Sequence, residues 1–149
     1  MKLPISHTFA AGPDEVFAAL VDPEILKRCI DGCENLVKTG EDTYEGRMKV
    51  GFAGIKGSYG GRVQITQKQP PESLTLEMEG KGAAGFVRTT AQIRLVPQGT
   101  GTSLTGEADA MVGGILAAVG SRLIEAASKK MMGDFFGRLD AELTSRRSS

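Results

Sequence analysis

The chain has 149 residues with 18 basic and 18 acidic side chains, so its formal net charge is zero. A chain of this length predicts one domain that buries about 68 to 70% of its unfolded surface, without need of a disulfide or metal. Because there is no basic excess or stripe, nucleic-acid binding is not expected. The first residues lack the apolar run of a secretory signal, and no stretch approaches the roughly 20 apolar residues of a spanning helix. We therefore expect a cytoplasmic protein without a transmembrane segment.

One strand and two short helices are predicted at the start of the chain. Apolar and polar residues alternate over residues 2–9, which is typical of a strand with one buried face. Gly12-Pro13-Asp14-Glu15 ends this alternation and places acids in the first turn of a helix. Asp22-Pro23-Glu24 repeats the signal, with aspartate as N-cap and proline at the first helical position. This second helix is expected to end near Gly32.

From Leu36 to about Val112 the alternation predicts an antiparallel meander of five or six strands. Glycine is frequent here, and 20 of the 149 residues are glycine although the usual share is about 7%. Several glycines are predicted to face inward, where they would let the sheet bend and would leave volume beneath it. The inward glycines are Gly46, Gly57, Gly61, Gly80, Gly82 and Gly106.

Gly113-Gly114 changes the period from 2 to 3.6, which predicts one long helix that ends at Thr144. Residues 145–149 are expected to form a disordered tail. Residues 1–144 then make a single α+β domain, in which the helix lies across the concave face of a strongly curved antiparallel sheet. An interior of small residues and methionines either collapses onto the helix or encloses an apolar cavity that takes a guest molecule.

The sequence offers few candidates for catalytic or metal-binding residues. Cys29 and Cys33 form a C-x3-C pair, which fits two reduced thiols, a reversible disulfide or, with ligands from elsewhere, zinc. His7 is the only histidine, and its position on a buried strand face favours a hydrogen-bonded core residue over a catalyst. Glu107 and Asp109 share the outer face of a strand, where we expect solvated charges. No phosphate loop, nucleophile elbow or histidine-rich metal motif is present.

Several motifs, taken together in their order and spacing, resemble the CoxG family, the G subunit of carbon monoxide dehydrogenase, within the START-like (SRPBCC) helix-grip superfamily. The resemblance covers almost the whole chain. In the first half it is carried by Asp22-Pro23-Glu24, Cys29-Ile30-Asp31-Gly32-Cys33-Glu34-Asn35-Leu36, Gly54-Ile55-Lys56-Gly57, Tyr59, Gly61-Arg62-Val63 and Pro70-Pro71 with Leu74. In the second half it is carried by Gly80-Lys81-Gly82, Gly85, Gly99-Thr100, Val112-Gly113-Gly114-Ile115-Leu116-Ala117, Gly120-Ser121-Arg122-Leu123-Ile124 and Phe135-Phe136. Asp31 stands where the family pattern has proline.

The resemblance implies a START-like helix-grip fold, with a sheet of about seven strands gripping the long helix over an apolar tunnel. It also implies a non-enzymatic accessory protein without cofactor. Such a protein assists a molybdenum oxidoreductase of the carbon monoxide dehydrogenase type and helps it to reach the membrane or its quinone pool. We therefore expect an apolar ligand, quinone-like or lipid-like, and a location at the inner face of the membrane through a partner or a peripheral contact.

The ligand site is expected near the first half of the long helix, with the Tyr59 hydroxyl as a polar contact and Gly120 allowing close approach. The predicted ligand-binding residues are Met48, Val50, Tyr59, Met78, Val87, Leu116, Val119, Gly120 and Leu123. Two other functions remain open. One is a polyketide cyclase/dehydratase-like enzyme that uses His7, and the other is a ligand-free adaptor that docks through Cys29–Glu34 and Val112–Gly120.

Overall fold

The computed structural model describes residues 1–52 and 54–148. Seven strands form one antiparallel sheet in the order β1-β7-β6-β5-β4-β3-β2, which confirms the α+β class and the strand number. The strands are β1 (Lys2–Phe9), β2 (Cys33–Gly40), β3 (Thr43–Val50), β4 (Gly57–Gln69), β5 (Ser73–Gly82), β6 (Gly85–Gln98) and β7 (Gly101–Gly113). The helices are α1 (Pro13–Leu20), α2 (Pro23–Cys29), the 3-10 helix η1 (Gly114–Val119) and α3 (Ser121–Ser148).

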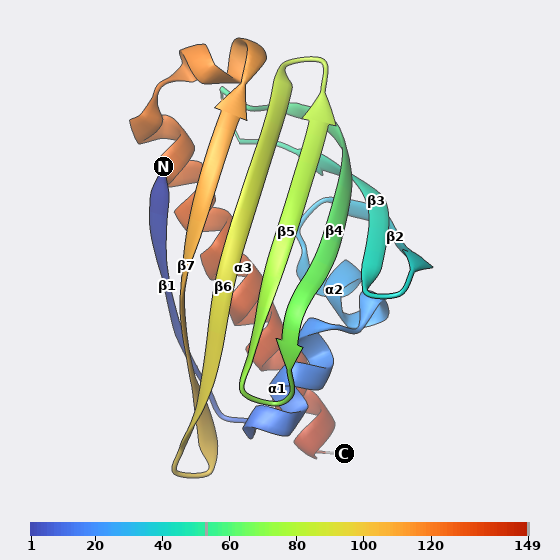
Figure 1. Cartoon of the computed structure of the whole chain (residues 1–149), viewed down its shortest axis with the longest axis vertical. Coiled ribbons are helices and arrows are strands. Elements are labelled where there is room, and N and C mark those ends of the chain that lie inside the picture. The colour runs from blue at the N-terminus through green and yellow to red at the C-terminus, as the bar shows by residue number, and fades with distance from the viewer. Residues whose placement is uncertain (53, 149) are drawn as a thin grey trace.

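The sheet curves around the long helix, as the helix-grip interpretation predicts. Figure 1 shows α3 passing behind the sheet, from the end where β7 finishes to the end where α1 and α2 lie. The strands β2 and β3 turn away from the plane of the others at one edge. The concave face of the sheet is therefore covered by α3 and, at one end, by α1 and α2.

The two short helices begin where the capping signals predict. The Asp22 side chain accepts a hydrogen bond of 3.0 Å from the backbone N–H of Glu24, and Pro23 occupies the first turn of α2. The helix ends at Cys29, and Gly32 makes the following turn with a φ of 78°. This early turn lets β2 begin at Cys33, three residues before the expected start of the meander.

The long helix differs from the prediction at both ends. Instead of one helix from Gly113-Gly114, the chain forms η1 and then breaks at Gly120, whose φ of 102° no α-helix accommodates. At the other end α3 continues through Ser148, so helical backbone extends into the expected tail. The chain has no glycine or proline after Gly137 that would stop it. Ser149 lies outside the described residues.

The core fills only part of the space between the sheet and the helices. In the half of the molecule that contains α1 and α2, large side chains from all layers interlock. Tyr44 is 3% exposed, and its hydroxyl donates a hydrogen bond of 2.7 Å to the carbonyl oxygen of Val21 between the helices. Leu104 of β7 and Leu139 of α3 are completely buried. The opposite half, towards η1, carries smaller side chains and contains the cavity described below.

Candidate functional site

A cavity of about 180 Å³, open to solvent, lies on the inner face of β2 to β6. Its residues occupy the strand positions that share a face with the buried Tyr44 and Ile65, as the strand register shows. The inward-facing lining residues are Cys33, Leu36, Gly46, Met48, Gly61, Val63, Met78, Gly80, Val87 and Thr89. Aliphatic and thioether groups dominate this surface, and the Thr89 hydroxyl and the Cys33 thiol are the polar side-chain groups of the inward-facing residues, while Asn35, Arg47, Arg62 and Glu79 border it from outward positions. The cavity therefore suits an apolar guest.

The space exists because two neighbouring glycines stand in the middle of the sheet. Gly61 of β4 pairs with Gly80 of β5, so one row of the inner face has no side chain on either strand. A Cβ atom at Gly80 would meet no heavy atom within 4 Å. In the rows further from η1, the same strands carry Ile65 and Leu74, which are buried in the core. The cavity begins where these large residues stop.

At other inward positions glycine is required for a different reason from the predicted one, which was to leave free volume. A Cβ atom at Gly82 would lie 2.6 Å from the carbonyl oxygen of Ser58 and 3.0 Å from the Tyr59 ring. Cβ atoms at Gly46 and Gly106 would collide with carbonyl oxygens of the neighbouring strands. These three glycines allow backbone or ring atoms to approach, so the missing side chain itself leaves no free volume, although Gly46 also borders the cavity.

One end of the cavity region is bordered by the loop between β3 and β4. The Tyr59 hydroxyl donates a hydrogen bond of 2.6 Å to the carbonyl oxygen of Ile55 in this loop. Gly54 lies against the side chains of Leu123 and Val119, and any Cβ atom there would collide with Leu123. The loop thus connects the sheet to the beginning of α3. Burial raises the pKa of Tyr59, so its phenol stays a protonated donor near neutral pH.

The nine residues predicted for the ligand site fall into two groups. Met48, Met78 and Val87 line the cavity, and Tyr59 and Val50 lie beside Met48 on the same face. The other group surrounds the loop and η1, where Leu116 is 1% exposed and donates its backbone N–H to the carbonyl oxygen of Ala84 at 2.8 Å. The members of this second group are Leu116, Val119, Gly120 and Leu123. The cavity therefore lies against the sheet rather than along the first half of α3.

Several lining residues are absent from the nine predicted ligand-binding residues, although Gly61 and Gly80 are predicted to face inward and leave volume. Gly61, Val63 and Gly80 stand on the predicted inward faces, and their alternation with Arg62 and Glu79 is the signal that would have included them. Leu36 comes from the edge strand β2, whose pattern is short. Thr89 is a polar residue at an inward position of β6, and only the register places it beside Met78.

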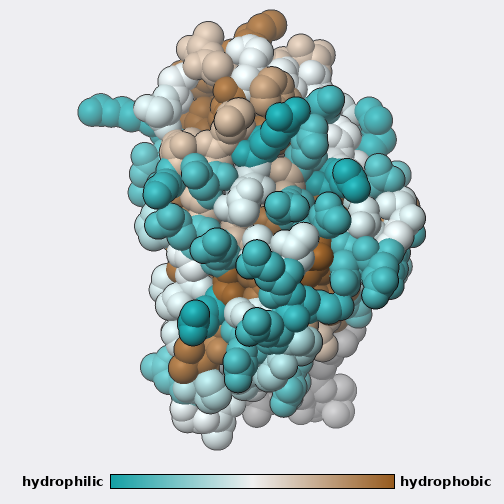
Figure 2. Space-filling view, viewed as in Figure 1, coloured by the Kyte–Doolittle hydropathy of each residue, from teal (hydrophilic) through white to brown (hydrophobic). Residues whose placement is uncertain are grey.

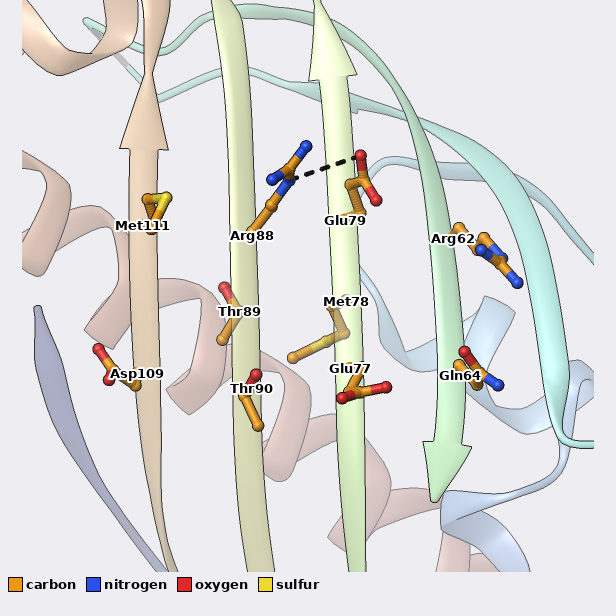
Figure 3. Close-up of a pocket in the computed structure, with 10 residues that line it drawn as sticks. All are labelled: Arg62, Gln64, Glu77, Met78, Glu79, Arg88, Thr89, Thr90, Asp109 and Met111. Carbon is orange, nitrogen blue, oxygen red and sulfur yellow. Dashed lines mark ion pairs between the residues drawn. The ribbon is translucent and has the colours of Figure 1, made fainter.

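A second depression, of about 400 Å³, lies on the outer face of the sheet. Figure 3 shows its side chains on β4 to β7, with Arg88 directed towards Glu79. The two form an ion pair of 3.7 Å. The other outward-facing lining residues are Arg62, Gln64, Glu77, Thr90, Asp109 and Met111, and the inward-facing Met78 and Thr89 border both hollows. Charges of both signs alternate here, which is typical of a solvated face or a polar contact with a protein.

The remaining candidate groups lie away from the cavity or at its edge. His7 of β1 stacks on Phe136, with ring centroids 5.5 Å apart, and its Nε2 lies 3.5 Å from an Asp140 oxygen. Cys29 and Cys33 are free thiols, and burial raises the pKa of both. Among residues 1–52 and 54–148, no cluster of three or more His, Cys, Asp or Glu side chains could hold a metal ion.

Comparison with known proteins agrees with this geometry. Residues 6–144 match the family model of CoxG, described as the G subunit of carbon monoxide dehydrogenase. A crystal structure of a conserved protein from Geobacillus kaustophilus is 34% identical, with a TM-score of 0.94 over 97% of this chain and 96% of that chain. A search of curated proteins finds no match.

More distant structures share the fold at lower identity. A protein from Chromobacterium violaceum is 13% identical, with a TM-score of 0.73 over 95% of this chain and 96% of that chain. A protein from Mycobacterium smegmatis is 18% identical, with a TM-score of 0.72 over 97% of this chain and 92% of that chain. None of the described helices is both long and apolar enough to span a bilayer.

Proposed function

The chain belongs to the CoxG family of carbon monoxide dehydrogenase G subunits, and from this premise we propose that it is an accessory carrier of an apolar molecule. The cargo is quinone-like or lipid-like and occupies the inner cavity. The protein acts without a cofactor of its own and serves an oxidoreductase of the carbon monoxide dehydrogenase type. It transfers the cargo between this enzyme and the membrane pool in which such molecules dissolve.

The observation that carries this proposal is the apolar cavity beside the Gly61–Gly80 row. An enclosed engineered cavity of about 150 Å³ holds one benzene, so the 180 Å³ of the open cavity found here has room for one ring or a short length of hydrocarbon chain. A ligand with a longer tail must extend out of the cavity. Met48 and Met78 adapt to different ring shapes because their side chains are unbranched and polarisable.

The side chains that face the cavity support binding rather than catalysis. General acid–base chemistry needs a titratable group within hydrogen-bond reach of the substrate. The inward-facing titratable group is the Cys33 thiol, whose pKa is raised by burial and which donates a hydrogen bond to the Asn35 carbonyl oxygen. The charged residues at the border, Arg47, Arg62 and Glu79, occupy outward positions of their strands. His7, the residue on which a cyclase-like mechanism would depend, lies on β1 at the other edge of the sheet from β2. The carrier function is therefore favoured over the cyclase/dehydratase alternative.

A ligand-free adaptor is the second candidate. It is supported by the outer depression, which is larger than the inner cavity and displays charges of both signs. Polar surfaces of this kind fit contacts between proteins in which charge sets the orientation. The two functions differ in one respect that can be measured, because only the carrier holds a small molecule.

The experiment is a comparison of native and denaturing mass spectra of protein purified without detergent, with analysis of the organic extract. The carrier predicts an apolar passenger that is present in the native spectrum and lost on denaturation, or uptake of a short-chain ubiquinone offered to empty protein. A protein that is empty and takes up neither quinone nor fatty acid would contradict the carrier function and favour the adaptor.

A further inference from the structure

The sheet ends at β2, whose outer edge pairs with no other strand of the described chain. Its register with β3 is regular over residues 35–38, with an irregularity on either side. An open edge is a row of unpaired N–H and C=O groups, which folded proteins usually cover or blunt. The other edge strand, β1, contains Pro4, which has no N–H to donate to a further strand. The β2 edge is therefore the better suited of the two to accept another strand.

The free backbone groups of this edge belong to Leu36 and Lys38. The backbone N–H of Arg47 on β3 points to β2, where it donates to the side chain of Asn35 at 3.0 Å. Bonding positions alternate along an antiparallel pair, so every second residue of β2, counted from Asn35, faces β3. Leu36 and Lys38 lie at the alternate positions and direct their backbone N–H and C=O groups to the open side.

The side chains of β2 also leave contacts unused. Val37, near the middle of the strand, is 56% exposed on the outer face. Lys38 makes no ion pair among the residues that the structure describes. The carboxylate of Glu34 is 45% exposed and lies 3.9 Å from the Lys49 ammonium group. An exposed valine on an open strand edge is a feature that pairing with another strand would cover.

The strand that fits this edge is a second copy of β2. When two copies run antiparallel about a two-fold axis at Leu36, each residue lies opposite the one equally far on the other side of the axis. Lys38 then faces Glu34 of the second copy, and Val37 faces its Asn35. The contact between opposite charges occurs twice, and no charge faces a like charge. The edge is therefore complementary to itself in charge.

We propose that the protein forms a two-fold dimer through β2, in which the two seven-stranded sheets join into one continuous sheet. The broad outer face of the sheet is a poorer contact for a second copy, because Figure 2 shows mainly hydrophilic side chains across its middle. Strand pairing needs few apolar side chains, since backbone hydrogen bonds supply much of the affinity. A strand of eight residues buries a small area, so the association is weak and depends on concentration.

The location of the cavity gives the dimer a purpose, and here the inference rests on the proposed carrier function. Leu36 lines the cavity from the edge strand. A two-fold axis at this residue places Leu36 of the second copy beside it, so each copy adds an apolar side chain at the edge of the other's cavity. Because the cargo would then contact both copies, bound cargo and dimerisation strengthen each other.

The test is sedimentation velocity of ligand-free full-length protein over a range of concentrations. Wild-type protein should show a monomer–dimer equilibrium that added salt weakens. Lys38→Glu places two acids opposite each other and should weaken dimerisation about tenfold or more. Adding Glu34→Lys to that variant restores opposite charges and should recover most of the lost affinity. Lys2→Glu is the matched control on the other edge strand, β1, and should dimerise like the wild type.

A mixture of Asn35→Cys and Val37→Cys proteins tests the register, because these positions lie opposite each other across the axis. Mild oxidation should cross-link the mixture into a heterodimer faster than it cross-links either variant alone. The proposal would be overturned by a protein that stays monomeric up to about 0.5 mM, by a dimer that Lys38→Glu leaves unchanged, or by cross-linking that is no faster in the mixture. Quinone uptake by dilute, monomeric protein tests the carrier function separately.

Discussion

The Tyr59 hydroxyl donates a hydrogen bond of 2.6 Å to the carbonyl oxygen of Ile55 and so ties β4 to the loop that lies over the first turn of α3. The sequence suggests instead that Tyr59 offers this hydroxyl to a ligand. Because the hydroxyl is already bonded within the protein, its role is to hold the loop beside the cavity. The polar group left to face a ligand is the Thr89 hydroxyl.

Removal of the Tyr59 hydroxyl should loosen the loop without unfolding the sheet. A single neutral hydrogen bond contributes about 0.5–1.5 kcal/mol. In Tyr59→Phe we expect amide exchange of residues 54–57 to accelerate about fivefold and bound quinone to dissociate faster. Tyr44→Phe is the control, since its hydroxyl bonds Val21 in the filled half of the core. The control should lower overall stability and leave exchange in the loop unchanged, and equal exchange in both variants would contradict this role of Tyr59.

A side chain at Gly80 should fill the cavity. No heavy atom lies within 4 Å of its Cβ position, and its backbone has an ordinary extended conformation, so Gly80→Leu can be accommodated in β5. We expect a folded protein whose affinity for a short-chain ubiquinone falls at least tenfold, measured by fluorescence quenching or calorimetry. Gly133→Leu makes the same chemical change on the exposed side of α3 and should bind like the wild type. Unchanged affinity in Gly80→Leu would place the ligand elsewhere.

Gly120 and Gly133 should respond to alanine in opposite directions. Gly120 has a φ of 102°, so alanine there is strained, and we expect a loss of about 1 kcal/mol or more in the free energy of unfolding. Gly133 lies exposed inside α3 with open space around it, so alanine should add about 0.5–1 kcal/mol. Urea denaturation measures both. The same strain makes Gly120→Leu unsuitable as a cavity-filling test. A stable Gly120→Ala would show that the break before α3 is not required.

The two cysteine thiols should react slowly in the folded protein. Burial raises the pKa of Cys29 and Cys33, so both stay protonated at neutral pH, and the thiolate is the reactive form. Because the folded pKa lies above the unfolded one, this contribution to stability is complete below about pH 8.5 and declines as the pH rises further. Reaction with a disulfide reagent should be much slower than in guanidinium, and Cys33 should react before the 1% exposed Cys29. Rapid labelling of native Cys29 would contradict this.

Alternation along the strands is enough to predict the sheet and most of its inward face. Met48 and Met78 are identified as inward residues because both of their neighbours in sequence are charged, and Val87 because Arg88 follows it. The capping signals at Asp22 and Pro23 likewise predict the start of α2. These features depend on residues that are neighbours in sequence, through the period-two alternation of strands and the few residues that start a helix. A single sequence therefore displays them directly.

The break in the long helix and the position of the cavity could not be predicted in this way. The apolar periodicity does not reveal that Gly120 has a positive φ, because a glycine can also stand inside a helix at a moderate cost in stability. The cavity depends on the pairing of Gly61 with Gly80, and this register is set by contacts across the whole sheet. Whether an inward glycine leaves volume or admits a neighbour, as Gly82 does for Tyr59, depends on the same long-range contacts.

The most direct test of the carrier function uses methyl NMR of methionine-labelled protein titrated with a short-chain ubiquinone. The chain has six methionines, of which Met48 and Met78 line the inner cavity and Met111 lies exposed on the outer face. We predict that the Met48 and Met78 methyl signals shift and saturate at one equivalent of quinone, while the Met111 signal stays in place. No shift at Met48 and Met78, or a shift confined to Met111, would contradict an apolar ligand site inside the sheet.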